Sequence, residues 1–65
     1  MNAEQLKGKW TQLKGSAKKK WGKLTDDDLD VINGQHEQLV GRIQERYGIA
    51  KEEAQRQVND WKEAA

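Results

Sequence analysis

A stripe of apolar side chains runs through residues 6–24 at the spacing of an α-helix. The stripe consists of Leu6, Trp10, Leu13, Ala17, Trp21 and Leu24. These six residues fall within roughly 80° of one another on a helical wheel. Two tryptophans on one stripe present a large apolar area, so other helices must close over it. We therefore expect one helix from the start of the chain to about residue 21, with the remaining helices packed against it.

The chain is short for a protein with a packed core. Its 65 residues include no cysteine, so no disulfide or thiolate metal site can supplement the core. A domain of this length buries only about 60% of the surface that its unfolded chain exposes. Charged residues make up 35% and apolar residues 34% of the chain, near the border between small folded domains and disorder. The three tryptophans and the regular periodicity favour the folded side, and we expect a single helical domain over residues 1–65.

Charge is distributed unevenly along the chain. Residues 1–25 carry seven lysines and one glutamate, whereas residues 26–30 carry four aspartates. The net charge of +1 conceals this division. The first helix is therefore cationic and the second opens with acidic side chains.

Glycine recurs every seven residues in the first helix, at Gly8, Gly15 and Gly22. The helical wheel places these glycines opposite the apolar stripe, on the solvent side. Each interior glycine costs roughly 0.5–1 kcal/mol relative to alanine. The first helix should thus be weak alone and depend on packing. The glycines either let this helix fray or leave a bare strip of backbone for another molecule to approach, or they occupy exposed positions that tolerate glycine.

Two segments carry the signature of a helix start. Asn2 and Gln5 can form a capping box, and Thr25 precedes three consecutive aspartates, residues 26–28. Carboxylates are favourable in a first turn, where the helix dipole is positive. A carboxylate cluster could also hold a divalent cation, but consecutive side chains on a helix diverge, and the ligand spacing of a calcium loop is absent. We interpret the aspartates as helix initiation and expect no metal site.

Two further segments carry the signature of a helix end, Asn33-Gly34 and Tyr47-Gly48-Ile49. Asparagine and glycine tolerate the left-handed conformation that ends many helices. The pattern therefore predicts a second helix from residue 25, a third over about 35–47 and a fourth from about residue 50. The expected core is Trp10, Leu13, Trp21, Leu24, Leu29, Ile32, Leu39, Ile43, Tyr47, Ile49, Val58 and Trp61.

No catalytic constellation is visible in the sequence. His36 is the only histidine and no cysteine accompanies it, so zinc binding or general-base chemistry lacks the required partners. We expect His36 to be half-buried or on the surface. Arg42 and Arg46 are expected to form an exposed basic pair balanced by Glu37 and Glu45. The sequence thus predicts no enzyme, no catalytic residue, no cofactor, no metal and no small-molecule substrate.

Several motifs together resemble a known family. They are the run WGKLTDDDLDVINGQHEQLVGRIQERYG over residues 21–48, VNDW over 58–61, and the upstream KGKW and LKG elements. These motifs resemble the CsbD-like family of small bacterial stress proteins, and the resemblance covers nearly the whole chain. It implies an all-α fold, a compact four-helix domain similar to two helical hairpins packed crosswise. It also implies a context of general and osmotic stress, without an enzymatic activity, a cofactor or site residues that could be carried over.

Three functions follow from these observations. The first is a non-enzymatic stress-response protein, a soluble protectant that works at high abundance. The second is weak, sequence-nonspecific nucleic-acid binding through the lysine-rich first helix. Lys7, Lys14 and Lys18 are the contact residues on one flank, and phosphates could also attach to the other flank, at Lys9, Lys20 and Lys23. The third is a helix lying on a membrane surface, which would require the domain to open.

The remaining expectations concern surroundings. No run of about 18 apolar residues is present, so we expect no membrane span. The N-terminus lacks the apolar core and cleavage site of a secretory signal. We therefore expect a cytoplasmic monomer.

Overall fold

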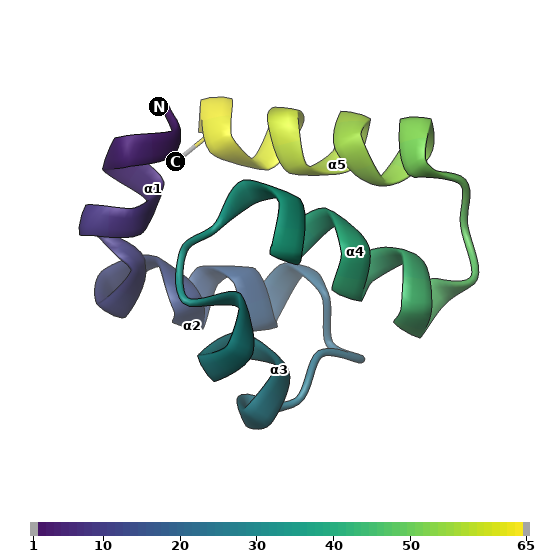
Figure 1. The fold of residues 1–65 in the computed structure, drawn as a ribbon, viewed down its shortest axis with the longest axis horizontal. Coiled ribbons are helices and arrows are strands. Elements are labelled where there is room, and N and C mark those ends of the chain that lie inside the picture. Colours follow the sequence, from purple (N-terminus) through teal and green to yellow (C-terminus); the bar gives the residue numbers. More distant parts are fainter. Residues whose placement is uncertain (1, 65) are drawn as a thin grey trace.

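The computed structural model describes residues 2–64, and Figure 1 shows their arrangement. Within this range lie the helices α1 (Ala3–Gly8), α2 (Trp10–Lys20), α3 (Asp26–Ile32), α4 (His36–Tyr47) and α5 (Lys51–Ala64). Helices α4 and α5 form an antiparallel hairpin, and α3 packs against α4 (Figure 1). The radius of gyration is 10.4 Å, close to the roughly 11 Å of a compact chain of this length. The predicted compact, all-helical fold is confirmed.

The first predicted helix is divided, which corrects the expectation of one continuous helix to about residue 21. Helix α1 ends at Gly8, and α2 starts at Trp10 after Lys9 leaves helical geometry at φ −106° and ψ 11°. A β-carbon added at Gly8 would meet nothing within 4 Å, so no packing compensates for the low helix propensity of glycine there. The chain bends at this point, and Leu6 and Trp10 nevertheless both remain buried.

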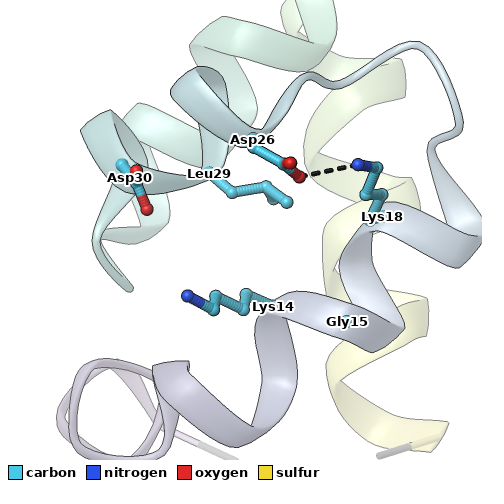
Figure 2. A pocket seen from close by; sticks show the side chains of 6 residues that line it. All are labelled: Lys14, Gly15, Lys18, Asp26, Leu29 and Asp30. Carbon is cyan, nitrogen blue, oxygen red and sulfur yellow. Dashed lines mark hydrogen bonds and ion pairs between the residues drawn. The ribbon is translucent and has the colours of Figure 1, made fainter.

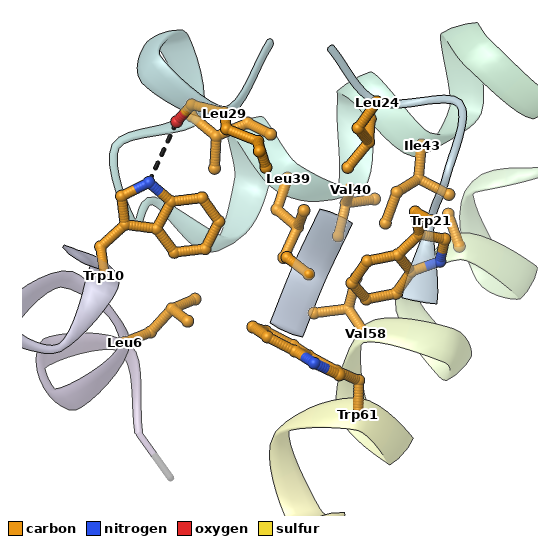
Figure 3. Packing of buried hydrophobic residues seen from close by; sticks show 13 residues of the cluster. Leu6, Trp10, Trp21, Leu24, Leu29, Leu39, Val40, Ile43, Val58 and Trp61 are labelled. Carbon is orange, nitrogen blue, oxygen red and sulfur yellow. Dashed lines mark hydrogen bonds between the residues drawn. The ribbon is translucent and has the colours of Figure 1, made fainter. Parts of the chain in front are cut away.

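The core forms between α2 on one side and the α4–α5 hairpin on the other (Figure 3). Within it, Trp21, which directly follows α2, packs against Trp61 of α5, with ring centroids 5.4 Å apart at an interplanar angle of 65°. Such an edge-to-face pair adds about 0.5–1.5 kcal/mol beyond the burial of its area. The two tryptophans therefore act as a spacer that fixes α2 against α5.

Each tryptophan also places its indole N–H on a partner in another element. Trp10 donates to the backbone oxygen of Leu29 on α3, as Figure 3 shows, at 3.0 Å. Trp21 donates to Gln57 on α5, and Trp61 donates to Ser16 on α2, both at 3.0 Å. A buried indole N–H without an acceptor would cost about 1–3 kcal/mol. These hydrogen bonds fix the direction in which each ring enters the core.

The predicted core is confirmed with small differences. Nine of the twelve predicted residues are buried, and Leu13, Tyr47 and Ile49 are half-buried against the cluster. The structure adds to the core Leu6, Ala17, Val40 and Ala54. Leu13 lies on the predicted stripe but packs only at the margin of the core.

The predicted helix ends are confirmed. Asn2 and Gln5 form a reciprocal capping box at the start of α1, and Thr25 and Asp28 form another at the start of α3. Asn33 adopts a left-handed conformation with φ 46°, as does Gly48 with φ 63°. Local sequence chemistry therefore sets where these helices begin and end.

Gly34 joins α3 to α4 and touches the backbone of α1. Its φ is 78°, and an added β-carbon would lie 2.6 Å from the α-carbon of Lys7 and 3.0 Å from the Leu6 carbonyl oxygen. Only a residue without a side chain allows this approach. The turn between α3 and α4 therefore holds α1 in place, and it lies where the bend at Lys9 redirects the chain.

We predict that Gly34→Ala lowers the free energy of unfolding by about 3 kcal/mol or more, because left-handed strain of about 1–2 kcal/mol adds to the clash with α1. Urea denaturation followed by circular dichroism measures the effect.

Two matched controls separate the causes. Gly48→Ala carries left-handed strain without a close contact, so it should cost only about 1–2 kcal/mol. Gly15→Ala lies in an exposed helical position with nothing within 4 Å and should stabilise by about 0.5–1 kcal/mol. Equal losses for Gly34→Ala and Gly48→Ala would show that the contact with α1 is unimportant.

Candidate functional site

The lysines predicted to contact nucleic acid lie on two helices rather than one. Lys7 lies on α1, before the bend, and Lys14 and Lys18 lie one turn apart on α2. All three are exposed. The structure therefore brings Lys14 and Lys18 together and places Lys7 on a separate element.

Lys14 and Lys18 line a hollow of about 360 Å³ between α2 and α3 (Figure 2). Its other lining residues are Gly15, Asp26, Leu29 and Asp30. Figure 2 shows Lys18 reaching across to Asp26, with its ammonium nitrogen 2.6 Å from a carboxylate oxygen. The hydrogen bond and the charge of Lys18 lower the pKa of Asp26, and Lys14 adds to the effect. The acidic start of α3 thus meets the lysines of α2 and partly neutralises them.

The most strongly held charge is Asp28, a residue that sequence reasoning assigned only to helix initiation. Its side chain is 2% exposed. Arg46 of α4 donates to both carboxylate oxygens, at 2.8 and 2.9 Å, and Arg42 donates at 3.3 Å. The backbone N–H of Thr25 donates at 2.9 Å. Asp28 therefore caps α3 and also joins it to α4.

This arrangement corrects the expectation that Arg42 and Arg46 form an exposed pair balanced by Glu37 and Glu45. Arg46 binds Asp28, and Arg42 contacts both Asp28 and Glu45. The hydrogen bonds from Arg46 hold the pKa of Asp28 well below its usual range, although burial opposes the shift. The pairing of Arg46 with Asp28 spans 18 residues of sequence, so no local sequence pattern predicts it. The one available signal is the presence of two arginines a turn apart on a helix that follows an acidic one.

His36 is half-buried, as predicted, at the start of α4. Its Nδ1 atom lies 3.1 Å from the ammonium nitrogen of Lys62 on α5. Burial is the main cause that lowers the pKa of His36, and Lys62 adds to it. His36 adjoins two shallow hollows whose walls include Glu37. Over residues 2–64 no group of three or more acidic, histidine or cysteine side chains is placed to hold a metal ion.

Three other lysines lie where α2 ends. Lys19 and Lys20 close α2, and Lys23 follows in the connection to α3. The ammonium nitrogen of Lys20 lies 5.7 Å from the ring centroid of Trp21, and that of Lys23 lies 5.1 Å from the ring of Tyr47. These positions are favourable because a cation is attracted both to an aromatic face and to the C-terminal end of a helix.

Comparison with known proteins identifies relatives along nearly the whole chain. Residues 4–56 match the sequence profile described as CsbD-like. The chain belongs to the CsbD-like family. It is 60% identical over 63 residues to a UPF0337 protein of Pectobacterium atrosepticum, covering 97% of this chain and 91% of the relative. It is 54% identical over 61 residues to UPF0337 protein YjbJ of Escherichia coli K12, covering 94% and 88%.

A more distant CsbD-like relative has the same extent. A UPF0337 protein of Protochlamydia amoebophila is 49% identical over 63 residues, covering 97% of this chain and 96% of the relative. The resemblance predicted from the motifs is thereby confirmed.

None of the helices in residues 2–64 is long and apolar enough to cross a membrane.

We predict that Asp28→Asn destabilises this CsbD-like protein by about 2–3 kcal/mol at pH 7, because hydrogen bonds between charged groups are lost. A carboxylate with a lowered folded-state pKa contributes stability above its unfolded pKa of about 4 and loses it as the pH falls further. Urea denaturation from pH 7 to pH 2 should therefore show a steeper acid loss for the wild type than for Asp28→Asn.

Asp27→Asn is the matched control, since it removes the same charge from the same turn but from an exposed side chain. It should change stability by about 0.5 kcal/mol or less. Similar losses for the two variants would contradict the role assigned to the buried carboxylate.

Proposed function

We propose that this protein is a non-enzymatic stress-response protein that acts in the cytoplasm as a soluble protectant. Its motifs resemble those of small bacterial stress proteins, and its family is CsbD-like. The observation that carries the proposal is the state of the interior. Within residues 2–64, every buried polar side-chain atom has a hydrogen-bond partner inside the fold. Buried polar groups that are satisfied in this way are typical of groups that serve the fold.

The exterior supports the same proposal. Charged residues make up 35% of the chain, and most of the lysines, arginines and carboxylates lie exposed on the surface. Among the large apolar side chains of residues 2–64, only Val31 is exposed, with 52% of its surface accessible. A surface with mixed charges and little apolar area resists association with other proteins. At high abundance such molecules would separate aggregation-prone proteins from one another as water is lost.

The direct test dries a labile enzyme with this protein or with an equal mass of albumin and measures the activity recovered after rehydration. We expect higher recovery with this protein, because its charged shell stays hydrated and non-adhesive. Recovery no better than with albumin would contradict the proposal.

Gly34→Ala serves as a control with unchanged charge and a single added methyl group. At a temperature where this variant is unfolded, its exposed core should reduce protection. Undiminished protection would show that the folded surface is not what acts.

An alternative function is weak, sequence-nonspecific nucleic-acid binding through the lysine-rich first 25 residues. The observation in its favour is that, among residues 2–64, every lysine except Lys18 is outside the ion pairs. The charges of these lysines are therefore available to phosphates. Lys7 and Lys14, with Lys18, remain the contact residues that the sequence predicts. Binding carried by phosphate contacts should weaken steeply as salt rises. Anisotropy of a fluorescently labelled DNA duplex tests this, and binding that is absent or independent of salt would exclude it.

A further inference from the structure

Neighbouring carboxylates distinguish two sets of lysines on and after α2. Lys18 is bound to Asp26, and Lys14 lines the same hollow beside Asp26 and Asp30. A phosphate approaching this side would meet two carboxylates. The flank chosen from the sequence is therefore poorly suited to a polyanion.

The second set consists of Lys19, Lys20 and Lys23, which we call the α2-end lysines. None of the ion pairs in residues 2–64 involves them. The two nearby aspartates of α3 whose contacts are defined are already occupied, Asp26 by Lys18 and Asp28 by Arg46. The carboxylates of Asp26 and Asp28 therefore do not pair with the α2-end lysines.

Two of the α2-end lysines, Lys20 and Lys23, also contact buried or half-buried parts of the fold. The backbone N–H of Lys23 donates to the hydroxyl oxygen of Tyr47 at 3.2 Å, which ties the α2–α3 connection to the end of α4. Lys20 lies over the buried ring of Trp21, and Lys23 lies over Tyr47. Charges that are already positioned lose less conformational freedom when they bind.

We propose that the α2-end lysines form the surface that contacts the phosphate backbone of nucleic acid, an inference that rests on the alternative function above. A membrane surface fits less well. Trp21 and Leu24, the large apolar residues beside the lysines, are only 2% and 1% exposed, whereas interfacial helices insert exposed apolar side chains. Val31, which is exposed, lies on α3.

The test compares two triple variants that lower the net charge equally. One carries Lys19→Gln, Lys20→Gln and Lys23→Gln, and the other carries Lys7→Gln, Lys14→Gln and Lys18→Gln. Binding to a labelled DNA duplex is followed by anisotropy at about 50 and 200 mM salt. Three phosphate contacts predict that wild-type affinity falls about 40-fold between these concentrations. Substituting the α2-end lysines should remove the salt dependence of binding and weaken binding about tenfold at low salt. The other triple variant should keep the salt dependence and the low-salt affinity of the wild type.

Each other outcome overturns a distinct part of the inference. If the wild type does not bind DNA, the alternative function itself fails. If the wild type binds and both variants weaken equally, net charge rather than the α2-end lysines is responsible. If vesicles containing phosphatidylglycerol compete with DNA as well as unlabelled duplex does, the assignment to nucleic acid is wrong. Circular dichroism of both variants must match the wild type, since all six positions are exposed.

Discussion

The structure depends on three tryptophans, each of which joins two elements through both its ring and its indole N–H. Trp10 links α2 to α3. Trp21 and Trp61 pack against each other, and Trp21 donates a hydrogen bond to α5 while Trp61 donates one to α2. A chain of 65 residues has too little interior for many such contacts. Three large side chains that each span a gap between helices supply much of the contact area that smaller residues could not. The weak, glycine-containing α2 is stable because these rings hold it.

The buried charge of Asp28 complements this apolar framework. The tryptophans hold α2 against α3 and α5, whereas Asp28 with Arg46 holds α3 against α4. Each buried polar atom that these contacts bring inside also finds a partner. The interior is therefore fully used in maintaining the fold, which leaves the charged exterior as the part of the molecule available for interaction.

Local chemistry allowed much of the fold to be predicted, because caps and stripes act over a few residues. The Thr25–Asp28 capping box, the left-handed Asn33 and Gly48, and most core residues follow from such patterns. The Asp28–Arg46 contact could not be predicted, since it joins residues distant in sequence. The bend at Lys9 was not predicted because the apolar stripe keeps its helical spacing across it. Gly34 illustrates the limit: its turn was predictable, but its contact with the backbone of Lys7 was not. The candidate lysines were identified as exposed cations, yet only the fold reveals that Lys18 faces Asp26.

The central claim, that tryptophan packing holds the helices together, is tested most directly by urea unfolding followed in one sample by tryptophan emission and far-ultraviolet circular dichroism. If the rings hold the helices, emission should shift to the red in the same transition in which helical signal is lost. A shift in emission at lower urea, with helix content intact, would contradict the account. It would show that the apolar stripe can open while the helices persist. That result would support the hypothesis that the first helix binds a membrane surface.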